Sequence, residues 1–159
     1  VNKKALHTLN EYCHNVKSMG TEDVDSIHPW VARLDSHIRF TGKSEKDVSM
    51  LMEVQKVCYV LGAGKVTFCK SGKDRTGMVI TLEQSRILGE RFNCGGGYQR
   101  LLQDADLMRQ YGPRLRICEK NIGKPVYSIN KIQTNFLPET LRPPRSTMED
   151  INLFKSDNT

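Results

Sequence analysis

The chain has 159 residues and a formal net charge of +6. This length suits one domain, and a chain of about 150 residues buries close to 70% of its unfolded surface. The positive charge favours acidic partners, which are an anionic membrane surface, inositol phosphates or nucleic acid. Nucleic acid fits least well, because only 7% of the residues are aromatic and the chain has no basic–aromatic repeat.

The cysteines are odd in number, scattered, and without a C-x-x-C spacing. They are Cys13, Cys58, Cys69, Cys94 and Cys118. This pattern argues against a disulfide framework or a zinc site and for a reducing, cytoplasmic compartment, and we expect no metal and no other cofactor. The sequence has neither a signal peptide nor an apolar run of ~18 residues, so we expect membrane contact to be peripheral.

The N-terminal part is expected to form two helices with a strand between them. Apolar side chains recur every three or four residues in residues 3–19, which predicts a helix that stops at Gly20. Residues 32–40 alternate between apolar and polar side chains, and this period of two predicts a half-buried strand. A capping-box-like start at residues 44–47 opens a second helix, which ends at Gly62.

The middle of the chain has the layout of an anion-binding loop. A short apolar stretch at residues 65–68 predicts a strand, and residues 76–90 predict a helix after an eight-residue turn. Such a turn can direct its backbone N–H groups inward, and the helix adds its positive N-terminal end. Further on, residues 98–111 predict a helix, and one or two more are expected in residues 114–138.

The turn reads CKSGKDRT at residues 69–76, and its residue types suit a phosphatase. A free cysteine is only a few per cent thiolate at neutral pH, but its pKa falls to about 3.5–7.5 at a helix N-terminus. Cys69 is therefore the predicted nucleophile, which forms a cysteinyl-phosphate. Arg75 is predicted to grip two phosphate oxygens through its planar fork. Ser71 and Gly72 are predicted to bind the phosphate, since Gly72 lets the backbone turn with its N–H inward.

Two further residues of the turn are predicted to assist the reaction. Thr76 can offer its hydroxyl to the Cys69 sulfur or help to expel it in the second step. Asp74 is the predicted general acid, which protonates the leaving alcohol and then activates water. A solvated turn residue is the alternative interpretation of Asp74. The rival acids lie upstream and are Asp23, Asp25 and Asp35.

Two lysines inside the turn indicate the class of substrate. A phosphotyrosine site needs a deep aromatic slot, whereas an inositol ring with several phosphates needs additional cations. Lys70 and Lys73, on the rim of the loop, could each meet a non-reacting phosphate as point charges. Two solvated surface lysines are the alternative interpretation.

The run CKSGKDRT, followed by Gly77-Met78 and by TLEQ at residues 81–84, resembles the catalytic region of the inositol polyphosphate 4-phosphatases, types I and II. Tyr127, Asn130, Gln133 and the turn LRPP at residues 141–144 resemble that family's C-terminal segment. The family signature reads CKSAKDRT, so Gly72 departs from it. The glycine form resembles the loop of secreted bacterial inositol phosphatase effectors.

The resemblance implies removal of the 4-phosphate of phosphatidylinositol 3,4-bisphosphate without a metal. It also implies an α/β fold, the protein tyrosine phosphatase-like sandwich in which helices flank a central, mostly parallel sheet. Because only two strands precede Cys69, a truncated form of this fold is expected. Residues 1–144 would form the catalytic domain, a fragment of a longer protein, and residues 145–159 a mobile tail.

Two alternatives to a phosphoinositide phosphatase remain open. One is a dual-specificity protein phosphatase, against which Lys70 and Lys73 weigh. The other is an inactive module that binds inositol phosphates without turnover. The phosphate position, the choice between lipid and soluble headgroup, and the oligomeric state are not predicted by the sequence.

Overall fold

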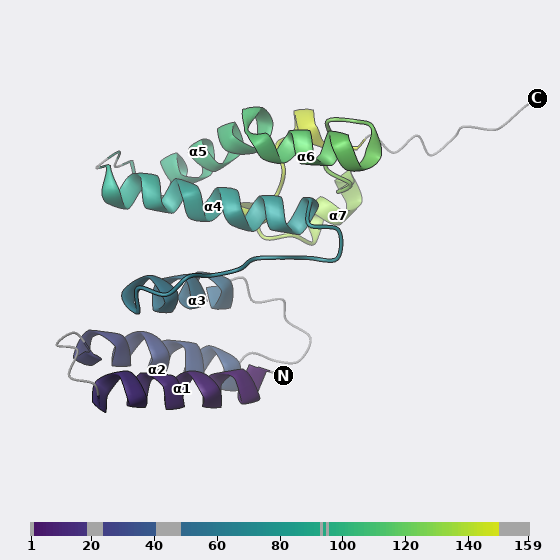
Figure 1. Cartoon of the computed structure of the whole chain (residues 1–159). Helices are drawn as coiled ribbons and strands as arrows, with labels where there is room; N and C mark the ends of the chain where they lie inside the picture. Colours follow the sequence, from purple (N-terminus) through teal and green to yellow (C-terminus); the bar gives the residue numbers. More distant parts are fainter. Residues whose placement is uncertain (1, 19–23, 41–48, 93, 95, 150–159) are drawn as a thin grey trace, which may run out of the picture. The chain divides into compact units, whose positions relative to one another are not determined.

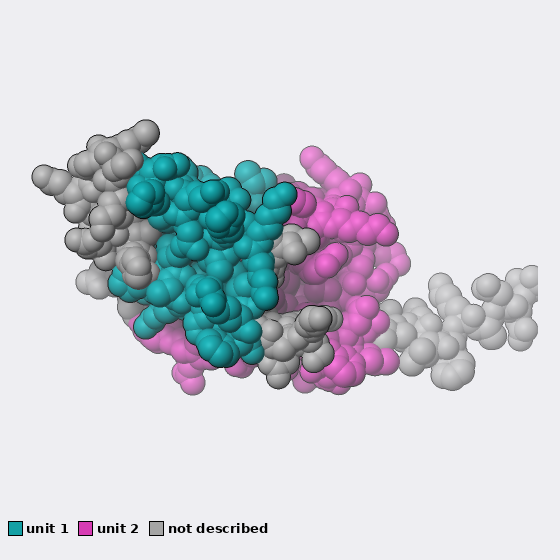
Figure 2. Space-filling view, turned by 90° about the horizontal axis from the view of Figure 1, so that it is seen from below, with its two compact units in different colours: residues 1–66 teal, residues 67–159 magenta. Residues whose placement is uncertain are grey.

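The computed structural model describes residues 2–18, 24–40, 49–92, 94 and 96–149 (Figure 1). The chain divides into two compact units, Val1–Val66 and Thr67–Thr159, which Figure 2 distinguishes by colour. Within the described residues, no helix is both long and apolar enough to cross a membrane.

The described residues of the first unit form three helices. They are α1 (Asn2–Ser18), α2 (Val24–Phe40) and α3 (Ser49–Val60). Helix α2 packs against both of the others around a small core. That core consists of Leu6, Val31, Leu34 and Val57. The helix expected at residues 3–19 is confirmed by α1, whereas Gly20 and residues 44–47 lie outside the described part of the chain.

The strand expected at residues 32–40 is wrong, because these residues belong to α2. Val31 and Leu34 are buried three positions apart, and Ile38 packs beside them one turn later. Phe40, which the alternating pattern would bury, is 83% exposed. Leu34 and Ile38 lie on one face both in a strand, with its period of two, and in a helix, with its period of 3.6. The short sequence of residues 32–40 therefore could not distinguish a strand from an amphipathic helix.

The second unit is built on two long helices that lie side by side, α4 (Asp74–Arg91) and α5 (Gly97–Tyr111) (Figure 1). The elements that follow are α6 (Pro113–Ile122), α7 (Lys131–Asn135), η1 (Glu139–Leu141) and η2 (Arg145–Thr147). Helix α5 matches the helix expected at residues 98–111. In the segment expected to be a mobile tail, residues 145–149 are described and Thr147 is buried.

The prediction of an α/β phosphatase sandwich with a central parallel sheet is also wrong, because the described residues contain helices and no strand. Their one isolated bridge pairs Tyr127 with Met148. Residues 65–68, the expected catalytic strand, have no regular structure, and Val66 and Phe68 are more than 80% exposed. An extended segment becomes a strand only when a neighbour pairs with its N–H and C=O groups, and the described residues provide none here.

A buried arginine on α5 joins the parts of the second unit. Arg109 is fully buried, and each of the five N–H donors of its guanidinium can be matched to an acceptor. Its Nε donates to Thr81 Oγ1 at 3.0 Å, and Nη1 donates to Asp106 Oδ1 at 2.9 Å. The remaining acceptors are the carbonyl oxygens of Met78, Thr140 and Arg142, at 3.2, 2.6 and 2.9 Å. Burial lowers the pKa of Arg109, and the Asp106 carboxylate opposes this effect.

We expect Arg109→Met to lower the free energy of unfolding by about 3–5 kcal/mol, because it removes all hydrogen bonds of the guanidinium, including those to the buried Thr81 hydroxyl and Met78 carbonyl. Urea titration followed by circular dichroism measures the change. The matched control is Arg116→Met on α6, where the arginine is exposed. Equal effects at both positions would contradict the central role of Arg109.

Helix α4 contains two glycines that differ in their surroundings. A Cβ on Gly77 would lie 3.1 Å from Tyr127 Cε1, whereas one on Gly89 would meet nothing within 4 Å. Gly89→Ala should therefore raise the free energy of unfolding by about 0.5–1 kcal/mol. In Gly77→Ala, overpacking of about 1–3 kcal/mol should cancel or exceed that gain. The same urea titration compares the two variants, and equal stabilisation would show that Tyr127 does not constrain residue 77.

Candidate active site

The CKSGKDRT turn forms a compact loop that runs directly into α4. Gly72 has a φ of +67°, a conformation that glycine adopts without strain, and its N–H donates to the Cys69 carbonyl at 3.2 Å. The Gly77 N–H then donates to the Lys73 carbonyl at 2.8 Å as the helix begins. The first N–H groups of α4 have no partner within the helix, so its positive end faces the loop.

Cys69 lies inside this loop, half-buried and reduced. Burial has the largest effect on its pKa and raises it. Hydrogen bonds from the Thr76 hydroxyl and from the backbone N–H groups of Thr76, Ser71 and Gly72 together outweigh burial. They lower the pKa of Cys69 from 9.0 to about 7, so about half of the thiol is ionised at neutral pH. The N–H groups of Thr76 and Ser71 thus favour the thiolate, as does that of Gly72, which also donates to the Cys69 carbonyl.

The Thr76 side chain influences this sulfur from inside the loop. Thr76 is only 4% exposed, and its Oγ1 has no hydrogen-bond partner among the described residues. A buried hydroxyl without a partner is unusual, and this hydroxyl helps to lower the pKa of Cys69.

The cations of the loop have different environments. Arg75, in the first turn of α4, is exposed and has no hydrogen-bond or ion-pair partner within the described part of the chain. Lys70 is likewise exposed, with no partner among the same residues. Lys73, in contrast, is buried, and its Nζ donates to Asp74 Oδ2 at 2.6 Å and to Ser128 Oγ at 2.7 Å. Arg75 and Lys70 are therefore available to an anionic ligand, while Lys73 is engaged by the protein.

Asp74 is engaged as well, at both of its oxygens. Its Oδ2 accepts from Lys73, and its Oδ1 accepts from the backbone N–H of Ser128 at 2.8 Å. Among the rival acids, Asp25 and Asp35 lie in α2 of the first unit, where Asp35 accepts from Arg39 at 2.6 Å. Asp23 lies outside the described residues.

Sequence reasoning did not single out Ser128, which is 54 residues from Asp74 and 55 from Lys73. The one signal near it was Tyr127, which carried part of the family resemblance. Arg114 on α6 was also missed, and its Cβ is 3.8 Å from where a Cβ on Gly77 would lie. No spacing rule connects residues so far apart, because only the fold brings them together.

Cys118 lies near the loop but has the opposite chemistry. It is fully buried, and burial, followed by the negative charge of Asp74, raises its pKa to about 11. Of these two cysteines, only Cys69 has an appreciable thiolate population at neutral pH. No three His, Cys, Asp or Glu side chains gather as metal ligands in the described ranges.

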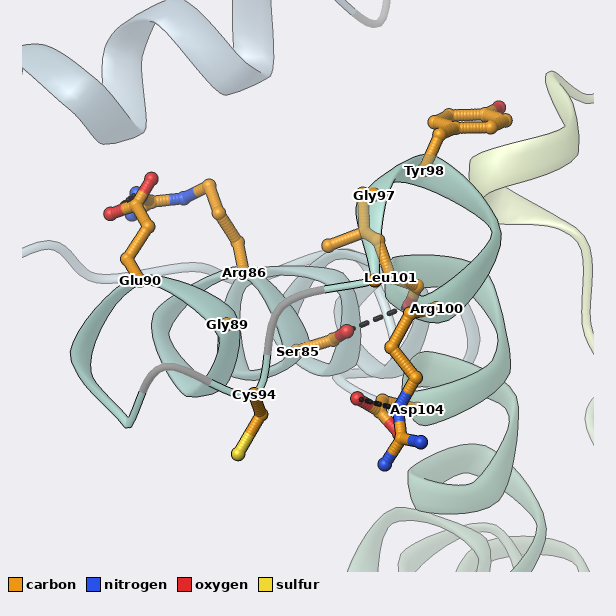
Figure 3. Close-up of a pocket in the computed structure, with 11 residues that line it drawn as sticks. Ser85, Arg86, Gly89, Glu90, Cys94, Gly97, Tyr98, Arg100, Leu101 and Asp104 are labelled. Carbon is orange, nitrogen blue, oxygen red and sulfur yellow. Dashed lines mark hydrogen bonds and ion pairs between the residues drawn. The ribbon is translucent and has the colours of Figure 1, made fainter.

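A separate pocket of about 270 Å³ lies toward the other end of α4 (Figure 3). Its walls come from Ser85 to Glu90 of α4, from Cys94, and from Gly96 to Asp104 at the start of α5. Two contacts brace it, from Ser85 Oγ to the Leu101 carbonyl at 2.7 Å and from Arg100 Nε to Asp104 at 3.0 Å. No residue of the CKSGKDRT loop lines this pocket.

Comparison with known proteins places this loop in a family. The family model described as INPP4A C-terminal domain matches residues 1–141. Type II inositol 3,4-bisphosphate 4-phosphatase from Rattus norvegicus is 33% identical over 111 residues, which are 70% of this chain and 12% of that protein. Inositol polyphosphate 4-phosphatase type II from Homo sapiens is 34% identical over 105 residues, which are 66% of this chain and 11% of that protein.

A relative with a different name also matches. The phosphatidylinositol 3,4,5-trisphosphate-dependent Rac exchanger 1 protein from Mus musculus is 37% identical over 67 residues, 42% of this chain and 4% of that protein. No solved structure matches the chain. The chain spans about one eighth of the length of the 4-phosphatases, and the matching family model describes a C-terminal domain. The expected match to the catalytic region is not shown, because the matching model is that of a C-terminal domain. The family expected from CKSGKDRT and TLEQ is confirmed, and the chain belongs to the INPP4A C-terminal domain family.

Proposed function

We propose that this chain carries the active site of a phosphoinositide phosphatase, with Cys69 as the nucleophile. The observation that carries the proposal is the environment of Cys69, whose pKa is lowered to about 7 by hydrogen bonds from Thr76, Ser71 and Gly72. Arg75, six residues later in the same loop, is exposed. The names of the two 4-phosphatase relatives support the reaction class.

In the proposed reaction the Cys69 thiolate attacks phosphorus, the bond to the leaving oxygen breaks, and a cysteinyl-phosphate forms. The backbone N–H groups of the loop and the guanidinium of Arg75 bind the phosphoryl oxygens, where negative charge must be stabilised. Water then cleaves the phosphorus–sulfur bond and releases phosphate. The Thr76 hydroxyl stabilises the departing thiolate in this second step.

The leaving oxygen also needs a proton. Asp74 is the acid inside the loop, but both of its oxygens accept hydrogen bonds, from Lys73 and from the Ser128 N–H. Donation from Asp74 would first require one of these contacts to open.

The proposed substrate is an inositol lipid headgroup, with the 4-phosphate of phosphatidylinositol 3,4-bisphosphate as the reacting group. The relatives' names support this position. Lys70 is the exposed lysine of the loop, so a non-reacting phosphate would bind there. A net charge of +6 is consistent with peripheral attachment of a cytoplasmic protein to an anionic membrane. A dual-specificity protein phosphatase remains the rival within the enzyme class.

A second candidate is a module that binds inositol phosphates without turnover. Relatives named as phosphatidylinositol 3,4,5-trisphosphate-dependent Rac exchangers match 42% and 52% of this chain, and these names describe no phosphatase. The two candidates share the loop and differ in whether Cys69 reacts.

The lowered pKa of Cys69 predicts its reactivity. Cys69 should stay ionised down to a lower pH than an ordinary cysteine does. Its alkylation by iodoacetamide should therefore reach half the maximal rate near pH 7. Mass spectrometry of the Cys69 peptide measures the rate. Thr76→Val should move the midpoint toward 9.0, while Thr76→Ser, which keeps the hydroxyl, should not. A midpoint near 9 in the unchanged chain would contradict the assigned environment.

Phosphate release tests the function directly. We expect the chain to release phosphate from short-chain phosphatidylinositol 3,4-bisphosphate and Cys69→Ser to abolish release, while Cys94→Ser, at an exposed cysteine, should have no effect. Arg75→Lys keeps the charge but loses the fork, and should slow turnover by a factor on the order of 10².

The same assay includes other phosphoinositides and a phosphotyrosine peptide. A preference for the peptide would support a protein phosphatase instead. Retained headgroup binding without release by the unchanged chain would support the binding module.

A further inference from the structure

We propose that Lys73, Asp74 and Ser128 form a clamp that positions the phosphate loop, and that Asp74 acts through this clamp rather than as the proton donor. The proposal rests on the proposed function of the loop. It assigns a role to Ser128 and gives Lys73 a partner other than the substrate.

The three residues close a ring of hydrogen bonds. The Lys73 ammonium donates to Asp74 Oδ2 at 2.6 Å and to Ser128 Oγ at 2.7 Å. The Ser128 backbone N–H donates to Asp74 Oδ1 at 2.8 Å. Each residue thus contacts the other two, which fixes their relative positions more firmly than a single ion pair would.

The two charged side chains of the ring are shielded from solvent. The side chains of Lys73 and Asp74 are 8% and 17% exposed. A buried charge that loses its partner remains in a medium of low dielectric constant, so opening the ring is strongly unfavourable. A lysine held in this way does not move freely toward a substrate phosphate.

The clamp lies between the donors that bind the Cys69 sulfur. Gly72 immediately precedes Lys73, and Thr76 follows Asp74 by two residues; both donate backbone N–H groups to the sulfur. A displacement of residues 73 and 74 would therefore move a donor on each side. The position of the clamp sets the geometry of the nucleophile.

The other side of the clamp is anchored in the core of the second unit. Tyr127, next to Ser128, is fully buried, and its hydroxyl donates to the Arg109 carbonyl at 3.0 Å. The Tyr127 N–H donates to the Thr147 carbonyl at 2.8 Å. Two residues after Ser128, a capping box between Asn130 and Gln133 begins α7. Ser128 is therefore presented by a segment that is held on both sides.

The engagement of Asp74 opposes a role as general acid. A carboxyl that protonates a leaving group needs a protonated oxygen directed at the substrate. Both oxygens of Asp74 instead accept hydrogen bonds from protein groups. In this arrangement Asp74 orients the loop, and neither of its oxygens is left without a protein partner.

The test measures the pH dependence of Cys69 alkylation in the 159-residue chain, which requires no turnover. Ser128→Ala and Asp74→Asn should each raise the midpoint by about one pH unit, so that alkylation at pH 6 falls about tenfold. Removing the negative charge of Asp74 would by Coulomb's law alone lower the midpoint, so a rise reports displaced N–H donors. Ser128→Thr keeps the hydroxyl and should therefore leave the alkylation midpoint where it is in the unchanged chain.

The matched controls are Ser146→Ala and Glu119→Gln, both at exposed positions outside the CKSGKDRT sequence. The double variant Asp74→Asn/Ser128→Ala should resemble either single variant, because the clamp is already open. Additive shifts, or a midpoint that stays near 7 in both single variants, would overturn the proposal. If Asp74→Asn does not fold, Ser128→Ala decides alone, because it removes only one exposed hydroxyl.

A second measurement separates positioning from acid catalysis. Asp74→Asn should slow phosphate release equally from phosphatidylinositol 3,4-bisphosphate and from p-nitrophenyl phosphate, whose activated leaving group needs no acid. A loss confined to the lipid would make Asp74 the acid and overturn the proposal. Absence of release by the unchanged chain counts against the proposed function alone, because the alkylation midpoints still decide whether the clamp exists.

Discussion

The buried guanidinium of Arg109 is the interaction on which the second unit depends. Desolvation disfavours this charge, and Asp106 together with the surrounding acceptors compensates for it. The Arg109 backbone carbonyl also accepts the hydroxyl of Tyr127, whose ring packs closely against Gly77. Gly77 directly follows Thr76, which helps to lower the pKa of Cys69. A continuous series of contacts therefore connects the core of the unit to the CKSGKDRT loop.

The loop separates its positive charges by burial. Lys73 and Arg75 are two residues apart, yet Lys73 is enclosed and paired with Asp74, whereas Arg75 is exposed at the start of α4. Because Lys73 is paired with Asp74 inside the protein, it holds the loop in place and is not available to an anion. Arg75 and Lys70 stay exposed and are the cations of the loop that an anion could reach. One short motif thus contains both a buried and an exposed cation.

The end of a helix was predictable where a glycine marks it, as at Gly62, which has a φ of +60° just after α3. Prediction failed at residues 32–40, where Leu34 and Ile38 satisfy a strand and a helix equally. It failed again at residues 65–68, because an apolar stretch reveals nothing about whether a second strand lies beside it.

The sequence by itself determined the CKSGKDRT loop. The spacing from Cys69 to Arg75, the turn at Gly72 and the helix that follows all arise from neighbouring residues. Contacts within eight residues depend on local backbone geometry, which residue types control directly. Only the tertiary structure decided that Lys73 is buried and that Ser128 contacts Asp74 across 54 residues. Such a contact depends on how α4, α5 and α6 pack, and packing is a property of the whole unit rather than of any one segment.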